Sequence, residues 1–140
     1  MNDEMIAGGL LNPSSGEMRS WMQELKENPD YCFDRLIDVT AVDRGEKFEV
    51  VYRLNSLKYD RDLVVKVETP REEPYVDSVA DLWLSASFGE REVHDMFGIV
   101  FAGHPDFRPL LAPEEGFGFF PLRKDYKLPG RAAAGQGVKA

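Results

Sequence analysis

Two stretches of alternating apolar and polar residues constrain the fold of this chain most strongly. Apolar side chains occupy every second position in residues 48–54 and again in residues 63–67. Successive side chains of an extended strand point to opposite faces, so each stretch predicts a strand with one buried and one wetter face. A short β-branched run at residues 36–42 predicts a third strand, and Gly45 in the turn after it can take a positive φ. The close spacing of the three favours an antiparallel meander.

An amphipathic helix is predicted before these strands. Ser14 and Glu17 have the spacing of a capping box, apolar residues then recur at helical spacing as far as Leu25, and Pro29 closes the segment. A helix packed on one face of a small antiparallel sheet is the architecture of an α+β domain. We therefore predict an α+β fold with helices on one face of the sheet.

A second helix is predicted over residues 87–97. The spacing from Ser87 to Glu90 resembles another capping box, and Gly98 follows the last apolar position as a natural helix stop. Between this helix and the strands, residues 76–84 are apolar enough for a short helix or a turn.

The chain from residue 99 to residue 140 is predicted to be an extended, irregular arm. Glycine and proline recur throughout it, so little regular structure is expected there. It nevertheless carries many large apolar residues, among them Phe101, Phe107, Leu110, Leu111, Phe117, Phe119 and Phe120. Apolar groups on a segment without a core of its own need a surface to lie on. We predict a domain at residues 1–98 and a docking arm with a basic tail at residues 99–140.

Charge is distributed unevenly between the body and the tail of the chain. Residues 1–120 contain 12 Lys and Arg against 24 Asp and Glu, whereas residues 121–140 contain five against one. A basic tail on an acidic body suggests that the tail has a partner of its own, although chain ends are also commonly solvated and frayed. Nucleic acid is the less favoured partner, because the field of the acidic body repels the same phosphate backbone.

Other features bound the cellular location. No run approaches the ~18–20 apolar residues of a membrane span. The first residues lack the basic and apolar regions of a signal peptide, and the single Cys32 cannot form an internal disulfide. We expect a soluble protein on the cytoplasmic side of the membrane.

The densest polar cluster lies in residues 90–108, which read EREVHDMFGIVFAGHPDFR. Its candidate metal ligands are Glu90, Glu92, His94, Asp95, His104 and Asp106. The two histidines are ten residues apart, and no CxxC or HExxH pattern accompanies them, so the spacing is unlike that of known zinc sites. The three acids of the predicted helix splay around it, whereas paired catalytic carboxylates face each other across a cleft.

An interface explains this cluster better than either kind of chemistry. The i, i+4 pairs Glu90–His94 and Arg91–Asp95 would each contribute only a few tenths of a kcal/mol to a helix. Arginine–carboxylate contacts with aromatic anchors are typical of protein interfaces. A small metal-dependent enzyme that uses His94 and His104, and a nucleic-acid module that uses the tail, remain alternatives.

Residues 90–108, followed by PLRKDYKL at residues 121–128, closely resemble the 30-kDa-subunit family of respiratory complex I, the NADH–quinone oxidoreductase of bacteria. The family run is close to E-R-E-x-x-D-[LM]-[FY]-G-[IV]-x-F-x-G-H-P-[DN]-x-R and is followed by P-L-R-K-D-[YF]. The DVTAVD stretch at residues 38–43 is also similar to the first core strand of that family. The resemblance covers residues 30–130.

The resemblance implies a non-catalytic structural subunit of the peripheral arm, in an enzyme that couples electron transfer to proton translocation. Its partners would be the 49-kDa-type subunit and neighbouring iron–sulfur subunits, with no nucleic acid and with the membrane reached only through the complex. FMN, iron–sulfur clusters and quinone would lie on those partners. No catalytic, cofactor-binding or metal-binding residue is then expected on this chain.

The family's signature maps onto two groups of residues in this chain. The first, termed here the signature corner, comprises Glu90, Arg91, Glu92, Asp95, Gly98, His104, Pro105, Asp106 and Arg108. The second, which would mark the docking arm, comprises Pro121, Arg123, Lys124, Asp125 and Tyr126. The chain departs from the common pattern at Pro109 and Lys127.

The histidine before Asp95 is compatible with membership of a second kind of complex. A histidine at the position of His94 also occurs among relatives in membrane-bound hydrogenases, where a large-subunit-like partner carries a NiFe centre, and F420H2 dehydrogenase complexes contain the same module. The family resemblance therefore leaves the electron donor and acceptor undetermined.

Overall fold

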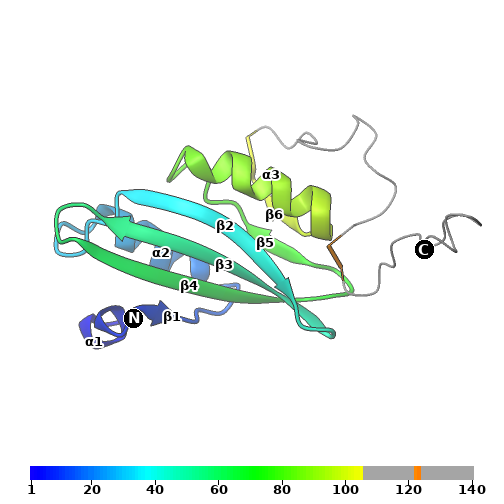
Figure 1. Ribbon diagram of the computed structural model, residues 1–140, viewed down its shortest axis with the longest axis horizontal. Coiled ribbons are helices and arrows are strands. Elements are labelled where there is room, and N and C mark those ends of the chain that lie inside the picture. The colour runs from blue at the N-terminus through cyan, green and yellow to red at the C-terminus, as the bar shows by residue number, and fades with distance from the viewer. Residues whose placement is uncertain (106–121, 124–140) are drawn as a thin grey trace, which may run out of the picture.

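The structure is a computed structural model that describes residues 1–105 and 122–123. Its elements follow one another along the chain as shown in Figure 1. They are α1 (Asp3–Ala7), β1 (Leu10–Leu11), α2 (Met18–Glu27), β2 (Arg35–Asp43), β3 (Lys47–Ser56), β4 (Arg61–Pro70), β5 (Tyr75–Asp77), α3 (Ser85–Phe97) and β6 (Val100–Ala102).

The main sheet has the strand order β1-β4-β3-β2. Strands β2, β3 and β4 pair antiparallel in sequence order, so the predicted meander is confirmed. The turn between β2 and β3 has Gly45 at φ 94°, and the Asp43 carboxylate accepts a hydrogen bond of 2.8 Å from the Gly45 N–H. The two-residue strand β1, which the sequence pattern does not predict, pairs parallel with β4 at the opposite edge from β2.

One face of the meander forms the core. Val50 pairs with Val67 and Tyr52 with Val65, and all four side chains are fully buried. Buried residues of α2 and of α3 belong to the same core, so the predicted α+β fold with helices on one face is confirmed. No helix in the described part of the chain has the length and apolar character needed to cross a bilayer.

Helix α3 lies beside β2 and approaches it closely (Figure 1). A Cβ built on Gly89 would come within 3.0 Å of the Val39 Cβ, which is closer than nearly all real side chains pack. The Ser85 hydroxyl also donates to the Leu36 carbonyl at 2.9 Å. The missing side chain of Gly89 therefore sets the spacing between this helix and the edge strand.

The helix boundaries show which capping signals predict the structure correctly. Helix α2 begins at Met18, where the Glu17 carboxylate accepts from the Ser14 N–H at 3.2 Å, as expected near a helix start. Helix α3 begins at Ser85, so the start predicted at Ser87 is wrong by two residues. The predicted stop is confirmed, because Gly98 has φ 83° and its N–H donates to the His94 carbonyl at 2.8 Å.

Two segments differ from prediction because strand pairing over a long sequence distance decides their structure. Residues 76–84 are predicted to form a short helix or turn, and residues 80–82 do form a turn closed by hydrogen bonds to the Val79 carbonyl. The prediction is wrong at the start of the segment, because Val76 lies in β5 and pairs with Phe101 of β6. The expectation of little regular structure after Gly98 is wrong for residues 99–105, because β6 forms there and Ile99 and Phe101 are buried in the core. The other residues of the arm, 106–121 and 124–140, lie outside the described part.

Replacing Gly98 with alanine should lower the free energy of unfolding by about 1–2 kcal/mol, because an L-residue is strained at positive φ. Urea denaturation of the full chain measures the loss. Gly16→Ala is the matched control, since a Cβ there would meet no heavy atom within 4 Å and its φ is not positive. Equal stability of the two variants would contradict the helix stop.

Candidate functional site

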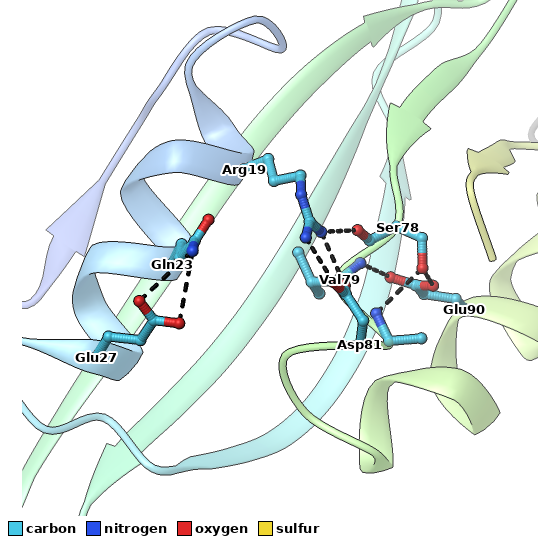
Figure 2. Close-up of polar contacts among 8 residues, drawn as sticks. Arg19, Gln23, Glu27, Ser78, Val79, Asp81 and Glu90 are labelled. Carbon is cyan, nitrogen blue, oxygen red and sulfur yellow. Dashed lines mark hydrogen bonds and ion pairs between the residues drawn. The ribbon is translucent and has the colours of Figure 1, made fainter. Parts of the chain in front are cut away.

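The Glu90 carboxylate is enclosed inside the fold. It accepts a hydrogen bond of 2.6 Å from the Ser78 hydroxyl and one of 2.8 Å from the Val79 N–H, as Figure 2 shows. Glu90 is 0% exposed, and this burial raises the pKa of Glu90 to about 7, against the opposing effect of the two hydrogen bonds. Glu90 is predicted to cap a helix and to mark an interface. In the structure it fastens Ser78 and Val79, which lie between β5 and α3, to helix α3.

Arg19 ties α2 to that same connection. Its guanidinium donates to the Ser78 carbonyl at 2.8 Å and forms a two-pronged ion pair with Asp81 (Figure 2). The hydrogen bond from Arg19 lowers the pKa of Asp81. Sequence reasoning missed this contact, because nothing in the spacing of Arg19 and Asp81 indicates that they meet across 62 residues.

The two histidines bind separate backbone carbonyls. His94 Nδ1 lies 3.0 Å from the Ile99 carbonyl oxygen, and His104 Nε2 lies 3.2 Å from the Ser87 carbonyl oxygen. A carbonyl can only accept, so each of these ring nitrogens carries a proton. His94 thus reaches across the C-terminal end of α3, while His104 fastens the chain after β6 to the first half of α3.

The described residues hold no cluster suited to a metal ion. No group of three or more His, Cys, Asp or Glu side chains in residues 1–105 and 122–123 could coordinate one. The hypothesis of a metal-dependent enzyme using His94 and His104 therefore has no geometric support in this part of the chain.

Arg123 binds its own chain. Its Nε donates to the Phe97 carbonyl at 2.6 Å, and its guanidinium carbon lies 5.1 Å from the centre of the Phe48 ring. The preceding Leu122 N–H donates to the Met96 carbonyl at 3.1 Å. Arg123 is predicted to mark the docking arm, and the structure shows that it satisfies a carbonyl at the end of α3.

An apolar groove of about 310 Å³ runs between β2 and α3. It is lined by Val39, Thr40, Ala41, Glu92, Val93, Met96, Phe97 and Leu122. Glu92 of the signature corner thus lies at a groove, whereas Glu90 lies in the interior.

The remaining signature residues divide between the interior, the surface and the part not described. Asp95 is buried, Arg91 is half-buried and Pro105 is exposed. Six predicted site residues lie outside the described part of the chain: Asp106, Arg108, Pro121, Lys124, Asp125 and Tyr126. Most of the described corner therefore builds the fold.

Two exposed apolar residues at the start of α3 were missed by the sequence analysis. Leu84 is 88% exposed and Phe88 is 56% exposed, and they stand one helical turn apart. Exposed apolar neighbours of this kind often mark a protein contact. Their spacing of four residues could have revealed the pair as neighbours on one helix. Because the predicted helix starts at Ser87, Leu84 was assigned to the segment before it.

The raised pKa of Glu90 predicts that the chain loses stability as the pH rises. A folded-state pKa of about 7 against an ordinary value of 4.5 means that this contribution is fully present below pH 4.5 and is lost as the pH rises through 7. The ion pair of Asp81 affects stability in a lower pH range. Because the pKa of Asp81 is lowered, its contribution to stability is lost only as the pH falls below 3.8. Urea unfolding from pH 4.5 to pH 8 should show wild type weakening relative to Glu90→Gln, whose amide stays neutral. Parallel stability curves for the two proteins would argue against a buried carboxylate.

Replacing Arg123 with alanine should lower the free energy of unfolding by about 1 kcal/mol, because a charged donor to a helix-end carbonyl and a ring contact are both lost. Arg35→Ala, at an exposed position of β2, should change it by less than about 0.5 kcal/mol. Chemical denaturation measures both variants. If the free energy of unfolding of Arg123→Ala equals that of the wild type, this contact contributes nothing to the stability of the fold.

Comparisons with known proteins converge on one family. Residues 12–132 match the family model described as the 30 kDa subunit of respiratory-chain NADH dehydrogenase. An NADH-quinone oxidoreductase subunit from Chloroherpeton thalassium is 43% identical over 106 residues, covering 74% of this chain and 44% of that protein. NADH-quinone oxidoreductase subunit 5 of Thermus thermophilus is 48% identical over 108 residues, covering 69% and 52%. The chain thus spans about half the length of the curated relatives it matches.

Two solved structures share the fold. A trypsin-resistant fragment of Nqo5 aligns with a TM-score of 0.63 and 38% identity, over 69% of this chain and 80% of the fragment. A chain of the membrane-bound sulfane sulfur reductase, an archaeal respiratory membrane complex, aligns with a TM-score of 0.78 and 26% identity, over 91% of this chain and 75% of that chain. Since the family model covers residues 12–132, which is most of the sequence, the chain belongs to the 30 kDa subunit family of respiratory-chain NADH dehydrogenase.

Proposed function

We propose that the chain is a non-catalytic structural subunit of the peripheral arm of a complex I-type NADH–quinone oxidoreductase. The observation that carries this proposal is the family match over residues 12–132, with curated relatives named as NADH-quinone oxidoreductase subunits. The site geometry supports a structural role, because Glu90, His94 and Arg123 are each bound to groups of their own chain. The complex would couple electron transfer to proton translocation.

The proposed partner is the 49-kDa-type subunit, with neighbouring iron–sulfur subunits. FMN, iron–sulfur clusters and quinone would be bound by those partners, and this chain would sit peripherally on the cytoplasmic side of the membrane. The surface best suited to such a contact is the exposed apolar pair Leu84 and Phe88 at the start of α3. Apolar and aromatic anchors of this kind supply most of the binding energy in typical interfaces.

A second candidate is the equivalent subunit of another respiratory membrane complex. It is favoured by the alignment with the sulfane sulfur reductase chain, which covers 91% of this chain. Membrane-bound hydrogenase and F420H2 dehydrogenase complexes belong to the same class of alternative, with a large-subunit-like partner that carries a NiFe centre in the hydrogenase case.

Affinity purification of the tagged chain from native membranes distinguishes these candidates. Recovery of a flavin-containing, NADH-oxidising neighbour would support the NADH–quinone enzyme, whereas a neighbour with a NiFe centre would support the hydrogenase type. Recovery of the chain alone, with turnover by the purified chain, would contradict a structural role in either complex.

Replacing Leu84 and Phe88 with glutamine should reduce recovery of the larger partner by about fivefold or more, because the loss of interface anchors costs more than ~1 kcal/mol. Leu10→Gln is the matched control, since Leu10 is also exposed but lies on β1 at the sheet edge opposite to β2. Quantitative mass spectrometry of tagged complexes gives the ratio, and circular dichroism confirms that the variants are folded. Equal recovery from both variants would exclude this face of α3 as a contact.

A further inference from the structure

The contact face proposed for α3 continues into the apolar groove beside β2. Residues at intervals of four lie along one side of this helix and its cap: Leu84, Phe88, Glu92 and Met96. Leu84 and Phe88 are exposed, and the other two line the groove. The stretch from Leu84 to Met96 is about 18 Å long at the rise of an α-helix. An extended segment of about five or six residues covers that length.

Glu92 is the charged group among the described residues that line this groove. The others are apolar except for Thr40, and Glu92 itself is half-buried. Within the part of the chain that the structure describes, Glu92 takes part in no hydrogen bond or ion pair. Arg123 follows the lining residue Leu122, but its Nε donates to the Phe97 carbonyl. The groove therefore presents a carboxylate with which none of the described cations pairs.

This carboxylate restricts what can cover the groove. Covering it removes Glu92 from water, which is strongly unfavourable unless a cation pairs with the carboxylate. Lipid acyl chains would leave the charge unpaired, and an anionic headgroup would repel it. A lysine or arginine beside an apolar side chain meets both needs, because the apolar group fills the groove and the cation binds the carboxylate. The acidic body, with 12 Lys and Arg against 24 Asp and Glu in residues 1–120, also attracts a positively charged partner.

We propose that the groove between β2 and α3 holds a segment of the larger partner subunit that carries a lysine or arginine next to an apolar side chain. This inference rests on the proposed function, because it needs a partner subunit, and it adds the chemistry of the contact. Leu84 and Phe88 supply apolar anchors at one end of the face. Glu92 sets the register of the bound segment, since a charge pair fixes position where apolar contacts alone do not.

Recovery of the larger partner with the tagged full chain from native membranes tests the charge pair. Glu92→Lys should reduce recovery about tenfold or more, because like charges then meet in the covered groove, and Glu92→Gln should reduce it less. Glu73→Lys is the matched control, since Glu73 is an exposed acid between β4 and β5, and it should keep wild-type recovery. Circular dichroism confirms that each variant is folded.

The dependence of recovery on salt gives a second measurement. Raising the salt concentration should weaken recovery of the wild type more steeply than that of Glu92→Gln, because salt screens the charge pair. This comparison decides the matter if Glu92→Lys does not fold. Wild-type recovery with a folded Glu92→Lys, or equal salt dependence of the wild type and Glu92→Gln, would overturn the proposal.

Photo-cross-linking identifies the occupant of the groove. Benzoylphenylalanine in place of Thr40, an exposed residue on the β2 side of the groove, should cross-link in the assembled complex to a peptide of the larger partner. That peptide should contain a lysine or arginine beside an apolar residue, and replacing this cation with glutamate should restore recovery with Glu92→Lys. Cross-links confined to residues 124–140 of the same chain, cross-links to lipid, or no cross-link would refute the assignment.

The proposed function and this inference fail in different ways. If the wild type recovers no partner, the proposed function is wrong and the groove assignment falls with it. If replacing Leu84 and Phe88 reduces recovery while Glu92→Lys does not, the subunit role stands and the groove assignment is wrong.

Discussion

The interior carboxylate of Glu90 is the constraint on which the rest of this corner depends. A carboxyl group removed from water must have hydrogen-bond partners, and here Glu90 accepts from the Ser78 hydroxyl and the Val79 N–H. Meeting that requirement fixes the connection after β5 against α3. It also places His104 within 3.8 Å, so the chain after β6 is brought to the same point.

This arrangement changes how the family signature should be understood. Conspicuous charged residues in a short motif suggest surface contacts, yet Glu90 and Asp95 are buried and Arg123 closes the end of α3. In the described part of the chain, Glu90 and Arg123 help to hold helix α3, the segment after β5 and residues 122–123 together. The proposed contact with another subunit then falls on apolar residues such as Leu84, which the motif does not include.

Local patterns in the sequence predicted the elements that local interactions determine. Alternation predicted β2 to β4, helical spacing predicted α2, and positive φ at Gly45 and Gly98 followed from glycine at turn and stop positions. Strands β5 and β6 have three residues each and exist through their pairing with each other, 25 positions apart from Val76 to Phe101, so no local pattern could reveal them. The direction of the Glu90 side chain was equally hidden, because capping-box spacing does not show whether a carboxylate faces solvent or core.

The close approach of Gly89 to Val39 has a consequence for how the protein meets its surroundings. An open sheet edge attracts foreign strands and is a frequent route to aggregation. Helix α3 lies against β2 near Val39, and its Ser85 already occupies the Leu36 carbonyl. A methyl group at position 89 would force Val39 or the helix to shift by a few tenths of an ångström, so the absent side chain lets α3 lie closely over that edge of the sheet.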